Sequence, residues 1–213
     1  MMLTVYGRAD SSNVQAVMWC IAELGLSCHR HDIGHRFGGT DTPEFIAMNP
    51  NRTVPVLVDS SGPAIWESGA ILRYLSNRYA TAPFWPSDPS DRAQIDKWAE
   101  WSKISVATNF TVPIFWALVR TPSAKRNYDA LQQAVLKFED RLKIADHQLS
   151  RNEYLAGNYF SLADISLGHI LYRYFDIDIT RADLPNLRAY YDRLAQRALY
   201  QTHVMISYEA LRE

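Results

Sequence analysis

The chain has 213 residues, a length that allows one large domain or two modest ones. Hydrophobic residues make up 47% of it and charged residues 21%, as in an ordinary globular protein that buries a sizeable core. The formal net charge of −1 gives no electrostatic reason to expect a nucleic acid as partner. The two cysteines, Cys20 and Cys28, are too few for a disulfide framework, so we expect a reducing cytoplasm.

Neither a signal peptide nor a membrane span is expected. Residues 1–7 lead directly into a strand pattern and lack the basic region and long apolar run of a signal peptide. No segment approaches the ~20 consecutive apolar residues that a spanning helix needs. We therefore expect no membrane as partner.

Strand and helix patterns alternate over the first eighty residues. Residues 3–6 alternate in polarity, as a short strand does. Apolar residues at helical spacing over 14–24 predict a helix, which Ser12 or Asn13 would cap. The order β-α-β-α-β-β-α predicts a mixed α/β sheet. The remaining elements of this half are expected as a strand at 28–33, a helix at 43–48, strands at 56–58 and 64–66, and a helix from 68.

Pro55 marks an open sheet edge. It heads the apolar run 56–58, and proline belongs at the first residue of a strand because it cannot donate to the ladder. It also pushes Val54 into an extended conformation. We therefore expect the N–H and C=O of Val54 to be free to pair with an extended peptide lying alongside. The sequence leaves the isomer of the Val54–Pro55 bond open.

Glu67 and Ser68 stand where the strand pattern changes to helical spacing. Ser68 is a suitable N-cap, and the start of a helix attracts a carboxylate. Glu67 would take an ammonium, so the pair would hold the head group of an α-amino acid. An ordinary capped helix is the alternative interpretation, and the open edge at Val54 favours the binding site.

Residues 81–89 mark a boundary, because three prolines and several turn residues separate two helical patterns there. The expected division is a first domain at 1–82, a linker at 83–89 and a second domain at 90–213.

Everything after the linker is helical in pattern. Residues 90–119 predict one long helix or two, with a kink at Pro113. Ser161 and Asp164 form a capping box ahead of an apolar helix that we expect to be the buried centre of a bundle. The other helices are expected at 123–148, 184–194 and 200–211.

Two motifs resemble those of a known family. Asn-Pro-x-x-x-Val-Pro-x-Leu, then Trp-Glu-Ser-x-Ala-Ile-x-x-Tyr-Leu, at residues 49–57 and 66–75, resembles the glutathione-binding half of cytosolic glutathione transferases. Residues 157–165 are similar to the segment that nucleates the family's helical domain. The resemblance implies a thioredoxin-like N-terminal domain with a mixed four-stranded sheet, an all-helical C-terminal domain and a homodimer.

The resemblance also implies how glutathione binds. The Val54 backbone would pair with the cysteinyl part, and Glu67 and Ser68 would hold the γ-glutamyl head group. Arg52 stands where relatives contact the glycyl carboxylate, although a solvated loop arginine is an equal alternative. The residues expected to bind glutathione are Ser12, Asn13, Arg52, Val54, Pro55, Glu67 and Ser68.

A hydroxyl at the start of the first helix would stabilise the glutathione thiolate. Lowering a thiol pKa from ~8.5 to ~6.5 asks the site for roughly 3 kcal/mol, which a charge-assisted hydrogen bond and a helix N-terminus mostly supply. The segment 6–17 is similar to serine-type relatives and places the hydroxyl at Ser11, with Ser12 as the alternative. Tyr6 is expected to be structural, Cys20 a core thiol and Cys28 a strand residue.

The electrophile site is expected to be apolar and to face Ser11 from the second domain, although packing in the bundle core is the alternative for each residue singly. Its candidates are Trp101, Ser105, Phe110, Phe115 and Tyr208.

The expected activity is the addition of glutathione, as co-substrate, to a hydrophobic electrophile, in detoxification. Two alternatives remain: glutathione-dependent disulfide or peroxide reduction, and a non-catalytic glutathione-binding protein. His29 and His31 lie on one face of a strand, but no third ligand is in register, so no metal is expected.

Overall fold

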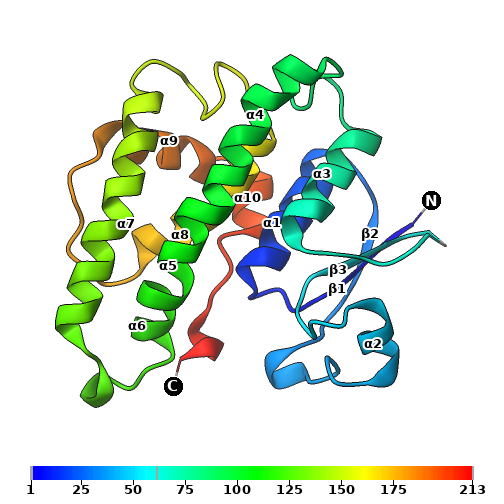
Figure 1. The fold of residues 1–213 in the computed structure, drawn as a ribbon, viewed down its shortest axis with the longest axis horizontal. Coiled ribbons are helices and arrows are strands. Elements are labelled where there is room, and N and C mark those ends of the chain that lie inside the picture. The colour runs from blue at the N-terminus through cyan, green and yellow to red at the C-terminus, as the bar shows by residue number, and fades with distance from the viewer. Residues whose placement is uncertain (1, 61, 213) are drawn as a thin grey trace.

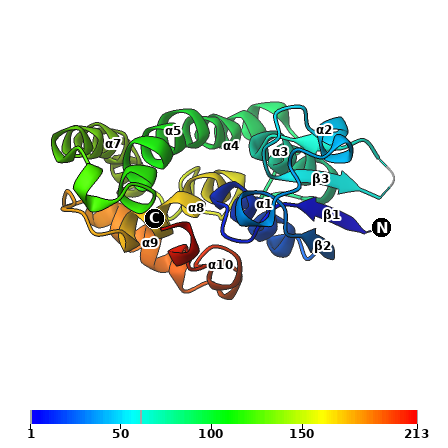
Figure 2. The same cartoon turned by 90° about the horizontal axis from the view of Figure 1, so that it is seen from below.

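A computed structural model describes residues 2–60 and 62–212. Two units lie side by side in it (Figure 1): a four-stranded sheet with helices α1 to α3, and an assembly of helices from α4 onward. The C-terminal segment returns to the junction of the two units, near α1 and α8 (Figure 2). The expected fold class, an α/β unit followed by an all-helical one, is confirmed.

The sheet is mixed and has the order β2-β1-β3-β4. Strand β1 pairs in parallel with β2 and antiparallel with β3, which pairs antiparallel with β4. Tyr6, the last residue of β1, is opposite both His31 and Val56. The C-terminal end of β1 and the N-terminal end of β3 therefore lie side by side at one end of the sheet. The strands are β1 (Leu3–Tyr6), β2 (Cys28–His31), β3 (Val56–Asp59) and β4 (Ile65–Trp66).

Three helices accompany the sheet: α1 (Ser12–Glu23), α2 (Pro43–Met48) and α3 (Ser68–Tyr79). The N-cap of α1 is Ser11, so the expected caps Ser12 and Asn13 are wrong by one or two residues. The N-cap of α3 is Glu67, with φ 68° and ψ 115°, so Ser68 is the first helical residue and not the expected cap.

Helix α1 joins the two units, because it packs on α3 of its own unit and on α8 and α10 of the other. Its Trp19 is fully buried and lies against Gly168 of α8. A Cβ at Gly168 would come within 3.0 Å of the Trp19 ring and 2.8 Å of Leu194, so the close approach of these helices needs glycine there.

One long helical stretch connects the units. It comprises α4 (Pro89–Trp101), α5 (Thr108–Phe110) and α6 (Ala117–Val119), joined by π-helical turns at Ser102–Ala107 and Thr111–Trp116. Pro113 lies in the second π turn, where local widening accommodates its missing N–H. The kink expected at Pro113 stays a prediction.

The same stretch is long and apolar enough to cross a membrane by length and composition alone, contrary to the sequence expectation. It nevertheless packs on α7 and α8 within the helical unit, as the core helix of a globular protein does.

The remaining helices are α7 (Tyr128–Leu149), α8 (Leu162–Asp176), α9 (Pro185–Ala195) and α10 (Ala198–His203). Helix α7 begins five residues later than expected, because Asn127 caps it and Ser123–Lys125 forms a separate 3₁₀ turn. The single last helix expected at 200–211 is wrong: α10 ends at His203, and a 3₁₀ turn follows at Glu209–Leu211.

Helix α8 is buried along most of its length, and the expected capping box at its start is confirmed. The Asp164 carboxylate accepts hydrogen bonds from the backbone N–H of Ser161 at 2.8 Å and of Leu155 at 2.9 Å, and from the Tyr190 hydroxyl at 2.8 Å. Burial raises its pKa to about 6, although these donors lower it. One side chain thus joins α8 to the preceding loop and to α9.

Candidate active site

The N-terminus of α1 lies at the junction of the two units, and the hydroxyl of its N-cap, Ser11, makes no capping hydrogen bond. Ser11 is half-buried and extended (φ −87°, ψ 121°), and its carbonyl accepts the first helical hydrogen bond, from the N–H of Gln15 at 2.8 Å. A serine N-cap normally bonds the second or third N–H of its helix. The Ser11 hydroxyl makes no such bond, and no other partner for it exists within residues 2–60 and 62–212. It is therefore available to a ligand, next to the positive end of the helix.

The unpaired backbone expected at Val54 is present, but it does not lie on an edge strand: β3 lies between β1 and β4, so Val54 precedes the start of a central strand. The Val54–Pro55 peptide is cis, and Val54 is half-buried. Its N–H and C=O make no hydrogen bond to any part of the chain that the structure describes. Gly7, the residue after β1, lies so close to Val54 that a Cβ on it would be 3.1 Å from the Cβ of Val54. The unpaired backbone is thus held directly against the loop that leads to Ser11.

Ser68 belongs to a polar cluster that crosses between the units. The Lys103 ammonium donates to the Ser68 hydroxyl oxygen at 2.7 Å and to Oδ1 of Asn13 at 2.8 Å, and the Ser68 hydroxyl donates to the same Oδ1 at 3.2 Å. Lys103 comes from the first π turn of the helical unit, and π turns are frequent at functional sites. Ser68 and Asn13 lie in the first turns of α3 and α1. Lys103 therefore adds a positive charge at the N-termini of both helices, which are the positive ends of their dipoles.

Burial governs the titration of this cluster. It lowers the pKa of Lys103, and the nearby carboxylates of Glu67 and Glu100 raise it again. His169 of α8 lines the same small pocket, and its Nε2 has no partner within the described residues. Burial, with the charges of Lys103 and Arg173, lowers its pKa to about 3, so it is neutral at pH 7.

Glu67 is exposed and holds a positive φ, a conformation that costs a non-glycine residue on the order of 1–3 kcal/mol. Arg52 is exposed too and also has a positive φ, of 56°. Residues with strained backbones cluster at ligand sites. Arg52 lies just before Val54 and the β3–β4 hairpin, and Glu67 lies just after the hairpin.

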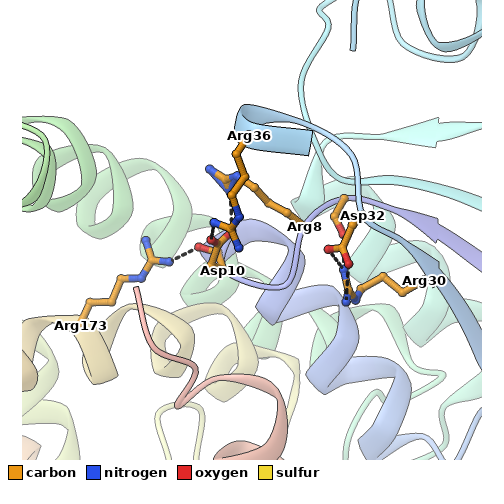
Figure 3. A network of polar contacts seen from close by, with 7 residues as sticks. Arg8, Asp10, Arg30, Asp32, Arg36 and Arg173 are labelled. Carbon is orange, nitrogen blue, oxygen red and sulfur yellow. Dashed lines mark hydrogen bonds and ion pairs between the residues drawn. The ribbon is translucent and has the colours of Figure 1, made fainter. Parts of the chain in front are cut away.

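A second polar cluster surrounds Asp10, the residue before Ser11, and is shown in Figure 3. The Asp10 carboxylate accepts from Arg8 at 3.3 Å and from Arg36 at 2.6 Å. Arg173 of α8 donates to the backbone carbonyl of Asp10 at 2.6 Å. Burial lowers the pKa of Arg173 to about 10, and the positive charges of Arg8 and Arg120 act in the same direction.

The residues expected to contact the electrophile are placed unequally. Phe115 and Tyr208 are in ring contact, with centroids 5.1 Å apart, and the Arg173 guanidinium lies 4.4 Å from the centre of the Phe115 ring. Phe110 packs on Phe138 and Tyr174 in the core. All three predicted rings are buried, with Phe110 1%, Phe115 0% and Tyr208 2% exposed. Trp101 and Ser105 are half-buried, on the same long helical stretch as Phe115.

The cysteines do not take part in the site. Cys20 is buried in α1, where burial raises its pKa to about 12, and burial also raises the pKa of Cys28. A thiol with a raised pKa is a poor nucleophile. No group of three or more His, Cys, Asp or Glu suited to a metal ion occurs in the described ranges, 2–60 and 62–212.

Comparisons with known proteins show the family to which the chain belongs. Residues 1–77 match the model of the glutathione S-transferase N-terminal domain, and residues 106–198 match that of the C-terminal domain. Glutathione S-transferase GstB of Escherichia coli K12 is 33% identical over 206 residues, with 96% of this chain and 99% of that protein covered. The chain belongs to the glutathione S-transferase family. It is an enzyme of this family, as the sequence resemblance implied.

Solved glutathione S-transferase structures share the whole fold. The theta-class enzyme of Xanthomonas axonopodis pv. citri, solved with glutathione bound, is 40% identical with a TM-score of 0.91, covering 96% of this chain and 98% of that one. BmGSTD1 of Bombyx mori shares the fold with a TM-score of 0.87 at 24% identity, covering 99% of this chain and 96% of that one.

Sequence reasoning missed the residues that reach the site from the helical unit. Lys103 and Arg173 lie on separate helices, and no motif surrounds either of them. Arg8 is part of the segment similar to serine-type relatives, but nothing in that segment gave it a role. The only available signal was that several arginines stand in otherwise apolar helical patterns, as Arg173 does in α8.

Proposed function

We propose that the protein catalyses the addition of glutathione to a hydrophobic electrophile, and that Ser11 stabilises the glutathione sulfur as a thiolate. The observation that carries this proposal is the unused hydroxyl of Ser11 at the start of α1. Because it does not cap its own helix, it can donate to a sulfur anion that also feels the helix N-terminus. Ser12 is buried as the first helical residue and is the less suitable donor.

The remaining contacts support the binding of glutathione as co-substrate in an extended form. The unpaired N–H and C=O of Val54 fit the cysteinyl backbone. Ser68, with Lys103 and the start of α3, suits the γ-glutamyl carboxylate, and Glu67 suits its ammonium. Asn13 holds the Ser68 hydroxyl, and Arg52 is the candidate for the glycyl carboxylate.

In the proposed reaction the thiol proton leaves to solvent as glutathione binds. The sulfur lone pair then forms a bond to the electrophilic carbon, and the leaving group departs with its electron pair. Trp101 and Ser105, which are half-buried, are the proposed walls on the electrophile side, and the buried rings of Phe110, Phe115 and Tyr208 support them from the core. A homodimer in the cytoplasm, acting in detoxification, is the further part of the proposal that rests on the family resemblance.

Steady-state kinetics with glutathione and 1-chloro-2,4-dinitrobenzene test the proposal. Ser11→Ala is expected to lower kcat/KM by about 100-fold, the range seen when one donor to a developing anion is removed. Ser12→Ala is the matched control and is expected to change it less than threefold. Equal losses in the two variants, or a loss only in Ser12→Ala, contradict the assignment to Ser11. Glutathione binding without turnover in the unmodified protein contradicts the enzymatic proposal and leaves a binding protein.

A further inference from the structure

The most unusual charges in the molecule are the arginines on the helical side of Ser11. Arg8, Arg36 and Arg173 come from three separate places in the fold and meet at Asp10: Arg8 and Arg36 pair with its carboxylate, and Arg173 donates to its backbone carbonyl. Arg120, the C-cap of α6, joins them because its guanidinium stacks on Trp116, the residue after the Phe115 on which Arg173 stacks. Its charge also lowers the pKa of Arg8 and of Arg173, after burial itself. Two of these arginines share the single Asp10 carboxylate, so the positive groups of the cluster outnumber the carboxylate that they contact.

The guanidinium groups of the cluster are incompletely bonded. Nε of Arg8, of Arg120 and of Arg173 is buried and has no hydrogen-bond partner in the described parts of the chain. Arg173 is only 3% exposed, so water does not readily replace the missing partner. Buried polar atoms are nearly always paired in native proteins, and unpaired ones call for a bound ion or a functional role.

Other arginines of the helical unit show what a structural role looks like. Arg126 donates to the carbonyls of Thr121 and Leu118, and Arg181 donates to three carbonyls, among them that of Tyr174. Arg120 makes no hydrogen bond through its side chain in residues 2–60 and 62–212, and it forms no ion pair there. Its guanidinium lies instead 4.6 Å from the centre of the Trp116 ring, as that of Arg173 lies over Phe115. Stacking on a ring fixes the plane of a guanidinium and leaves its N–H edge for a ligand.

The position of the cluster relates it to the reacting sulfur. Arg8 and Asp10 are in the loop that ends at Ser11, and the N–H of Ser11 donates to the carbonyl of Arg8 at 3.2 Å. Arg173 ties the same loop to α8, and its guanidinium covers Phe115, on the long helical stretch that also carries Trp101 and Ser105. A group bound between Arg120 and Arg173 therefore lies next to the loop that leads to Ser11.

We propose that the electrophile carries a carboxylate, which Arg120 and Arg173 bind on their aromatic supports while Arg8 borders the reacting carbon. A carboxylate fits because guanidinium presents paired N–H donors that match its two oxygens. This inference rests on the proposed function and names its substrate class. It replaces the purely apolar electrophile site expected from the sequence by one with apolar walls and a cationic end.

Direct binding to the glutathione-loaded protein tests this without requiring turnover. Isothermal titration calorimetry compares 3-nitrobenzoate with 3-nitrobenzamide, which differ in charge but little in shape. The benzoate is expected to bind at least tenfold more tightly, and the preference is expected to shrink as ionic strength rises. Equal affinities overturn the inference.

Two variants show whether the preference for the benzoate comes from the arginine cluster or from the overall charge of the protein. Arg120→Gln is expected to reduce the preference for the benzoate to less than threefold. Arg188→Gln removes an exposed arginine of α9 that pairs with Asp192, and it is expected to leave the preference unchanged. An unchanged preference in Arg120→Gln, with its thermal unfolding also unchanged, contradicts the proposal. If Arg120→Gln weakens glutathione binding instead, the cluster holds a carboxylate of glutathione, and the inference about the electrophile fails.

A kinetic comparison then links the cluster to the reaction. Glutathione sulfur displaces chloride from 4-chloro-3-nitrobenzoate or 4-chloro-3-nitrobenzamide, forming a C–S bond while chloride leaves with the C–Cl electron pair. With each rate divided by its uncatalysed rate, kcat/KM is expected to favour the benzoate at least tenfold. Turnover of both without preference overturns the inference and keeps the proposed function. Turnover of neither, while 1-chloro-2,4-dinitrobenzene is converted, overturns the inference and keeps the proposed function. No turnover of any of the three overturns the proposed function and the inference with it.

Discussion

The two sides of the α1 N-terminus are built in different ways. On the side of the sheet, the groups available to glutathione are backbone atoms and short side chains, such as Val54, Ser68 and Asn13. On the helical side they are long basic side chains, Lys103 and Arg173 among them, which reach in from separate helices. Backbone groups suit one fixed peptide. Basic side chains supply positive charge, and their position depends on how the separate helices pack.

This difference teaches where specificity can change in such a fold. A backbone edge is set by strand pairing and by Pro55, so a side-chain substitution alters it little. A guanidinium or ammonium at the end of a long side chain is lost by one substitution without disturbing the helix that carries it. We therefore expect the glutathione side to resist point changes and the helical side to respond to them.

The largest effect is expected from a substitution that destabilises the helical unit. Asp164→Ala deletes the acceptor of four buried donors at the start of α8, the helix that carries Arg173. Leaving those donors unpaired is expected to lower the free energy of unfolding by about 3 kcal/mol or more. Urea unfolding measures this. Asp91→Ala, in the exposed first turn of α4, is the control and is expected to change it by less than about 0.5 kcal/mol. Comparable losses in both variants would show that Asp164 has no special role.

A substitution of Lys103 tests whether the helical unit contributes to glutathione binding. Lys103→Met keeps the length of the side chain and removes the ammonium that donates to Ser68 and Asn13. The dissociation constant of glutathione is expected to rise about tenfold, the worth of one charge-assisted hydrogen bond of ~1.4 kcal/mol. Calorimetric titration measures it, with the exposed Lys97→Met on the same helical stretch as control. Unchanged affinity in Lys103→Met would assign glutathione binding to the sheet unit alone.

The smallest expected effect concerns the strained residue of the sheet side. Glu67→Gly relieves the positive φ and removes the carboxylate, whereas Glu67→Ala removes the carboxylate and keeps the strain. The glycine variant is expected to exceed the alanine variant in free energy of unfolding by about 1 kcal/mol. Both are expected to bind glutathione more weakly than the unmodified protein. Equal stabilities in urea would mean that the Glu67 backbone stores no strain.

The sheet unit was largely predictable from the sequence, because its signals are local. Alternation over 3–6, the Pro43 helix and the Val-Pro strand start each occupy a few consecutive residues, and the structure confirms these elements. The caps were harder. Ser12 and Ser68 have the composition of N-caps, but the chain direction at the loops makes Ser11 and Glu67 the caps. A propensity identifies residue types and not the dihedral angles that decide the position.

The helical half of the site could not be predicted in the same way. Phe115 and Tyr208 are 93 positions apart, and their contact follows from the packing of the chain end on the long helical stretch. The expected helix at 200–211 was wrong for a related reason: its apolar residues contact the core from a turn and an extended segment, which mimics helical spacing. The arginine cluster depends on four elements at once, and no single segment shows it.

The central claim is that the hydroxyl of Ser11 holds the glutathione sulfur as a thiolate, and ultraviolet absorbance of the thiolate tests it most directly. The titration follows bound glutathione from pH 5 to 9 in the unmodified protein, Ser11→Ala and Ser12→Ala. We expect the sulfur of bound glutathione to titrate near pH ~6.5 in the unmodified protein and in Ser12→Ala, and at least one unit higher in Ser11→Ala. A titration midpoint that Ser11→Ala leaves in place would contradict the account.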